Sequence, residues 1–97
     1  MYVRTKSGFE CNINERKLKD WTFAKALAKC DSGDESQALE GATFIVPFLL
    51  GKDGEEALME HLKDDEGIVE TAAILREVKE IIALMSAEIK KSQSSPE

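Results

Sequence analysis

The chain has 97 residues, of which 42% are hydrophobic and 33% are charged, and its formal net charge is -6. This length indicates one domain with a small core, and the apolar fraction is too high for a disordered chain. An acidic surface repels phosphate, so we expect neither nucleic acid nor an anionic membrane as a partner. No apolar run approaches the roughly 20 residues that span a bilayer, and the first residues are too polar for a signal peptide.

Residues 1–13 have the pattern of a β-hairpin. In the second half of this segment apolar and polar residues alternate, which is typical of a half-buried strand; the apolar positions are Phe9, Cys11 and Ile13. The preceding Lys-Ser-Gly predicts a turn in which Gly8 takes a positive φ. Because an isolated hairpin is only marginally stable, we expect it to lie on a helix or to pair with a neighbouring chain.

The next segment predicts a helix over residues 21–30, preceded by a short capped turn over residues 14–19. Asp20 is the expected N-cap of this helix. The face that we expect to be buried consists of Trp21, Ala24, Leu27 and Ala28, with Phe23 beside it. Trp21 is the only tryptophan, and two interpretations stay open for it: a core residue, or an anchor at a protein interface, where tryptophan is enriched.

Residues 37–50 form the most apolar part of the chain and predict a helix that is apolar nearly all round. Such a helix is buried on most sides, and in a domain this small it indicates self-association or a partner surface. Pro47 removes a hydrogen bond and clashes with the preceding turn, so we expect a kink or a break there. Gly51 is expected to end the helix by taking a positive φ.

A shorter helix is predicted over residues 53–63, with Leu58 and Leu62 facing inward. It contains His61, the only histidine, which we expect at the surface or at the rim of the core. A long helix follows over residues 71–91. Its apolar stripe recurs at steps of three and four, and its charged residues, among them Glu77, fall mostly on the other side.

The predicted fold is therefore mainly α: an N-terminal β-hairpin followed by about four helices, the last one long and amphipathic. We expect a single domain over residues 1–91 and a flexible polar tail over residues 92–97.

We find no pattern that indicates catalysis, a cofactor or a metal. The acidic stretch that begins at Asp31 lacks the glycine and the final glutamate of a calcium loop, and no glycine-rich phosphate loop is present. Cys11 and Cys30 form no zinc motif, and we expect both to be reduced. The prediction is a protein that is not an enzyme, binds no cofactor and uses its surplus apolar surface to bind another protein.

Two apolar rows are the candidate surfaces for partner binding and self-association. The first row consists of Phe44, Ile45, Phe48 and Leu49, and the second of Leu75, Val78, Ile82 and Met85. Periodicity alone does not tell which row is core and which is interface. Trp21 is a further candidate anchor.

Three stretches carry a resemblance to a known family: TKSGFECNIN, LKDWTFAKALAKCDSGD and LLGKDGEEALMEHLKDDEGIV. In their order and spacing they resemble the small tail assembly chaperones of long-tailed, siphovirus-like bacteriophages and prophages of Gram-positive bacteria. The resemblance covers roughly residues 4–86, and none of its motifs is a catalytic signature. Pro47 departs from the family pattern, in which we expect an uninterrupted helix.

The resemblance implies a self-associating helical protein that binds the tape measure protein and keeps it soluble until the tail tube forms around it. Such a protein acts in the host cytoplasm and is absent from the mature virion. Two alternatives stay open. One is an acidic phage-encoded regulatory protein that occupies the nucleic-acid-binding surface of a host protein, and the other is a minor tail component of the virion.

Overall fold

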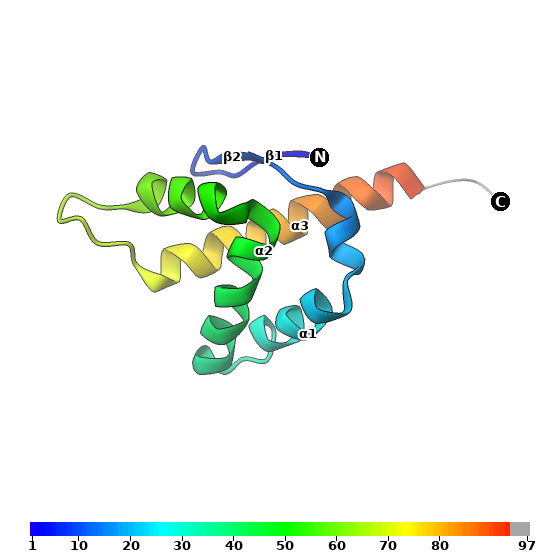
Figure 1. Cartoon of the computed structure of the whole chain (residues 1–97), viewed down its shortest axis with the longest axis horizontal. Coiled ribbons are helices and arrows are strands. Elements are labelled where there is room, and N and C mark those ends of the chain that lie inside the picture. The colour runs from blue at the N-terminus through cyan, green and yellow to red at the C-terminus, as the bar shows by residue number, and fades with distance from the viewer. Residues whose placement is uncertain (94–97) are drawn as a thin grey trace.

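The computed structural model describes residues 1–93, with side chains for residues 1–90. Its elements are β1 (Tyr2–Arg4), β2 (Glu10–Asn12), the 3-10 helix η1 (Glu15–Lys19), α1 (Trp21–Cys30), α2 (Glu35–Leu62) and α3 (Thr71–Gln93) (Figure 1). Over this part of the chain the fold is mainly helical with an N-terminal hairpin, as predicted. It has three α-helices, however, and not about four. The predicted flexible tail lies outside the described residues from residue 94 onward.

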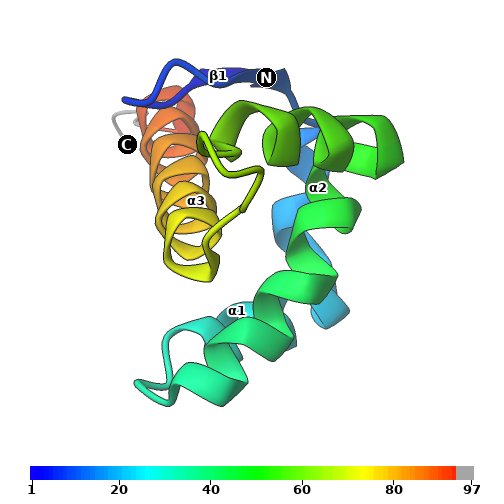
Figure 2. The same ribbon diagram turned by 90° about the vertical axis from the view of Figure 1, so that its left-hand side faces the viewer.

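The helix count differs because the two middle helices join into α2. Gly51 takes the predicted positive φ (φ 76°, ψ 172°), but the next helical turn begins directly after it, so α2 bends without an intervening loop. The kink expected at Pro47 is wrong, because the non-helical dihedral angles lie four residues later. Thr43, whose carbonyl loses its partner at Pro47, is exposed, and water can satisfy that carbonyl. The two halves of α2 run in clearly different directions (Figure 2).

The hairpin forms as predicted and lies on helices. Its strands are antiparallel with Val3 opposite Cys11, and Gly8 has a φ of 96°. The Lys6 amide donates a hydrogen bond to a carboxylate oxygen of Glu80 on α3, at 2.8 Å. His61 of α2 is exposed, as expected, and its ring lies 5.7 Å from that of Phe9. These contacts fix the hairpin against α3 and the second half of α2.

The core lies where the hairpin and the three helices meet. Leu58 of α2 and Met85 of α3 are fully buried at its centre. The other core side chains of the four elements and their connections are Val3, Phe9, Ile13, Phe23, Ala26, Cys30, Ala42, Ile45, Val46, Leu49, Val78, Ile81 and Ile82.

Two predictions about helix faces are wrong. On α1 the buried row is Phe23, Ala26 and Cys30, whereas Trp21 is exposed. This row has the same helical spacing as the predicted one, and its contacts with α2 decide between them. On α3, Glu77 is only 6% exposed, and its Oε1 has no hydrogen-bond partner among the described residues. The hairpin that covers α3 accounts for this burial, which periodicity within α3 could not show.

Candidate protein-binding surface

The surface is built on an unusually close contact between α1 and α2. A Cβ atom on Gly41 would overlap the carbonyl oxygen of Ala26 and would lie 3.0 Å from Cys30 Sγ. The Cys30 thiol in turn donates to the Ala38 carbonyl oxygen at 3.6 Å. Because only glycine allows this approach, α1 and the first half of α2 form one closely packed pair.

An aromatic row runs from the core of this pair to its surface. The buried Phe23 ring stacks on Phe48 at 6.1 Å between centroids, and Phe48 stacks on Phe44 at 5.0 Å. Phe44 and Phe48 are half-buried. The inner end of the row therefore belongs to the core, and its outer two side chains remain partly accessible to a partner.

A groove of about 230 Å³ lies between α1 and α2 at the outer end of this row. Phe44 is the largest apolar residue that lines it, and Lys25 and Lys29 line it from α1. Lys29 also pairs with Glu40 across the groove at 3.2 Å. Trp21 lies one turn before Lys25 on the same side of α1 and is 74% exposed. The core interpretation of Trp21 is thus wrong, and the interface interpretation stays open.

The start of α1 is held by its predicted cap. The Asp20 carboxylate accepts a hydrogen bond from the Phe23 amide at 2.9 Å, which satisfies a free donor of the first turn. Trp21 directly follows this cap as the first residue of α1. Trp21 is therefore held on an ordered helix rather than on a loose segment.

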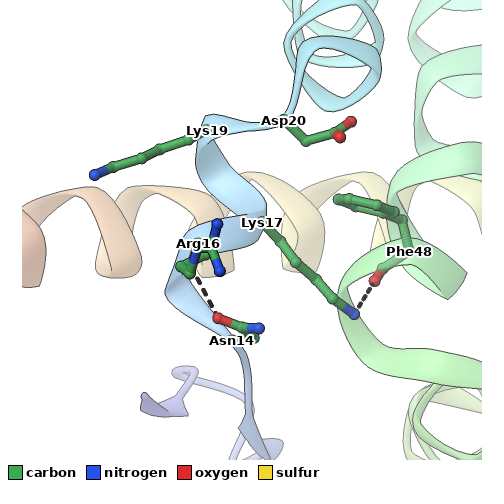
Figure 3. Close-up of a pocket in the computed structure, with 6 residues that line it drawn as sticks. All are labelled: Asn14, Arg16, Lys17, Lys19, Asp20 and Phe48. Atoms are coloured by element: carbon green, nitrogen blue, oxygen red, sulfur yellow. Dashed lines mark hydrogen bonds between the residues drawn. The ribbon is translucent and has the colours of Figure 1, made fainter.

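A second hollow, of about 340 Å³, lies beside η1 and is shown in Figure 3. We call it the basic recess; its lining residues are Asn14, Arg16, Lys17, Lys19, Asp20 and Phe48. Lys17 Nζ donates to the Phe48 carbonyl oxygen at 2.7 Å and lies 5.3 Å from the centre of the Phe48 ring. The break at Gly51 explains this contact, because Lys52, which would bond to this carbonyl in an unbroken helix, lies beyond the bend. A cation at the end of a helical segment is also favoured by the helix dipole.

The structure separates the eight predicted binding residues into two groups. Five are buried within the single chain: Ile45, Leu49, Val78, Ile82 and Met85. Three are partly exposed: Phe44, Phe48 and Leu75. A partner of the folded chain can reach only the second group, so the α3 row is chiefly core, and the α2 row divides between core and surface.

Among the described residues, sequence reasoning missed five exposed large hydrophobic side chains, Tyr2, Leu39, Met59, Ile68 and Leu84. It also missed the basic recess, for which a signal existed in the cluster of cations at positions 16, 17 and 19.

Both cysteines are in environments that disfavour reactivity. Burial raises the pKa of the Cys30 thiol, and the charge of Asp31 raises it further. Burial likewise raises the pKa of Cys11, with a smaller contribution from Glu77. At neutral pH both thiols stay protonated, and a protonated thiol is a poor nucleophile.

Comparison of the chain with protein-family models, curated proteins and solved structures found no match. Among the described residues, no His, Cys, Asp and Glu side chains gather in a group of three or more that could hold a metal ion. No helix in the same part of the chain has both the length and the apolar content needed to cross a membrane.

Proposed function

We propose that this protein is a phage tail assembly chaperone that binds the tape measure protein and keeps it soluble during tail assembly. The observation that carries the proposal is the 74% exposure of Trp21, one helical turn before Lys25 of the groove that Phe44 also lines, on an acidic protein. The ordered stretches that resemble the chaperone family support the same function. A tape measure is a long helical chain with exposed apolar stripes. An apolar groove is suited to cover such stripes, and the negative charge of the protein helps to keep the complex dissolved.

The proposed contact is a helix laid along the groove between α1 and α2. Its apolar stripe covers Trp21 and Phe44, and carboxylates on its flank meet Lys25. Since Gly41 keeps α1 and α2 in close contact, the groove needs little rearrangement on binding, which lowers the entropic cost. Phe48 and Leu75 are not required for this contact.

Co-expression with the tape measure protein tests the proposal. Wild-type chaperone should keep the tape measure in the soluble fraction and co-purify with it, and Trp21→Ala should reduce both. Tyr2→Ala is the matched control, because Tyr2 is another exposed aromatic residue, on the outer face of the hairpin. Equal loss with both variants, or no effect of Trp21→Ala, would count against the groove as the client site.

Two further observations test the chaperone proposal, and the second also separates it from a virion component. A tape measure gene directly downstream supports the chaperone, and absence from a phage tail gene cluster counts against it. The chaperone acts in the host cytoplasm, so mass spectrometry of mature particles should not detect it. Its detection at stoichiometric levels would favour a minor tail component instead.

The regulatory alternative draws on one feature of the chain. Eight carboxylates lie between Asp53 and Glu70, and such a concentration of charge can compete with nucleic acid for a basic surface. In that case the protein should displace DNA or RNA from a host protein in a competition assay. The chaperone proposal expects no displacement.

A further inference from the structure

The charge of the chain is strongly segregated. Residues 15–30 hold five cations and two carboxylates, a net of +3, although the whole chain is at -6. Residues 53–70 hold one cation and eight carboxylates, a net of -7. The first segment is η1 with α1, and the second is the end of α2 with the loop that leads to α3. Each molecule therefore carries two surfaces of opposite sign.

The negative surface ends in an ordered loop with an apolar tip. The Asp64 carboxylate accepts hydrogen bonds from the amides of Glu66 and Ile68, both at 2.9 Å. The Asp64 amide donates to the Ile68 carbonyl oxygen at 2.9 Å, which closes the loop. Ile68 is 50% exposed, and Asp65 and Glu66 beside it are also exposed.

The basic recess has the complementary chemistry. Arg16 and Lys19 are exposed cations on its rim, and the half-buried Phe48 ring supplies an apolar wall. Its volume of about 340 Å³ has room for a branched apolar side chain with a flanking carboxylate. Lys17 is already bonded to the Phe48 carbonyl, so Arg16 and Lys19 are the cations that can meet an incoming acid.

The loop cannot reach the recess of its own chain. In Figure 1 the loop between α2 and α3 lies at one end of the molecule, and η1 lies on the other side of α2. Figure 2 agrees, with the loop toward the viewer and the η1 region behind α2. Contact between the two surfaces therefore requires a second molecule.

We propose that the acidic loop of one copy, residues 64–68, docks into the basic recess of the next copy. Ile68 packs against the Phe48 ring, and Asp65 and Glu66 meet Arg16 and Lys19. Such a contact joins two different surfaces, so every added copy still presents a free loop and a free recess, and growth continues into an open filament or closes into a ring. The inference specifies the self-association expected of the proposed chaperone, but it does not depend on the client.

Sedimentation velocity over a salt series is the first test. Screening lengths fall from roughly 30 Å at about 0.01 M salt to roughly 3 Å at about 1 M. The mass of the monomer is 10.8 kDa. The mass of the sedimenting particle should exceed this value at low salt and should equal it at high salt. A wild-type protein that stays monomeric at every concentration and salt level would overturn the proposal.

Charge reversal tests the two surfaces separately. Arg16→Glu with Lys19→Glu, and Asp65→Lys with Glu66→Lys, should each yield a monomer. The four changes in one chain restore complementarity with reversed signs and should restore assembly, as should an equimolar mixture of the two double variants. The control is Arg76→Glu with Lys79→Glu, at exposed sites on α3. It changes the net charge by the same amount as the double variant at Arg16 and Lys19, and it should assemble normally.

Circular dichroism melts establish that each variant is folded before its mass is interpreted. If the folded fourfold variant stays monomeric, or if the control loses assembly to the same extent, the proposed pairing is wrong. A monomeric wild type that retains fluorescent single-stranded DNA at the recess would also overturn it, in favour of a nucleic-acid site. Loss of tape measure binding with assembly intact would contradict the proposed function and leave this inference in place.

Discussion

The apolar residues of α2 and α3 look alike in the sequence and behave differently in the fold. On α3 most large apolar side chains lie in one stripe, although Leu84 is exposed, and the residues of its candidate row are buried, apart from the partly exposed Leu75. The first half of α2 is apolar nearly all round, so one side enters the core while Phe44 and Phe48 stay half exposed. A single stripe thus identifies a core face, whereas apolar residues on every side supply a core and a surface together.

The sharpest test of this comparison places a carboxylate in each row. Met85→Asp buries a charge at the fully buried centre of the core and should cost more than about 4 kcal/mol, enough to unfold the protein. Phe44→Asp should cost only about 1 kcal/mol, because its side chain can reach water. Urea unfolding followed by circular dichroism measures both. Equal destabilisation would mean that Phe44 is as much a part of the core as Met85.

The contact that orients α2 can be broken at Gly41. Alanine usually stabilises a helix relative to glycine by roughly 0.5–1 kcal/mol. Here the added methyl group collides with the Ala26 carbonyl, so Gly41→Ala should destabilise the protein by about 1–3 kcal/mol. Thermal melts at several urea concentrations measure the change. A gain in stability would show that α1 and α2 have room to separate.

A smaller effect is expected at the cap that positions Trp21. Asp20→Ala removes the acceptor for the Phe23 amide and should cost about 1 kcal/mol. Asp31→Ala, at the other end of α1, is the control, since the carboxylate there opposes the helix dipole. Chemical denaturation of both variants checks the prediction, and a larger loss at Asp31 would contradict it.

The smallest effect concerns pH. Because burial raises the pKa of Cys30 in the folded state, the unfolded thiol ionises first as the pH rises. Stability should therefore be unaffected at neutral pH and should decrease as the pH rises above about 8.5, the usual cysteine value. Cys30→Ala should flatten that decrease. Alkylation by iodoacetamide should be slow at neutral pH without denaturant; rapid labelling of Cys30 would show that its contact with α2 opens readily.

The features that the sequence predicted correctly are those decided by neighbouring residues. The hairpin, the Asp20 cap and the positive φ of Gly8 and Gly51 each follow from a few adjacent positions. The position of His61 at the rim was also predicted, because a polar residue next to the inward-facing Leu62 on a helix lies at the edge of the buried face.

The features that the sequence did not predict depend on distant segments. Gly41 selects the row of α1 that is buried, and its partners Ala26 and Cys30 lie more than ten residues away. Glu77 is buried by a hairpin some 65 residues earlier in the chain, so no period within α3 could reveal it. The division of the α2 row likewise depends on where α1 packs.

The contact between Lys17 and the Phe48 carbonyl joins two parts of the chain through a single acceptor. While α2 bends at Gly51, that oxygen is open to the ammonium group. If α2 straightened, the Lys52 amide would compete for the same oxygen and weaken the hydrogen bond between η1 and α2. Two donors 35 residues apart thus share one acceptor, and the shape of α2 is coupled to the placement of η1.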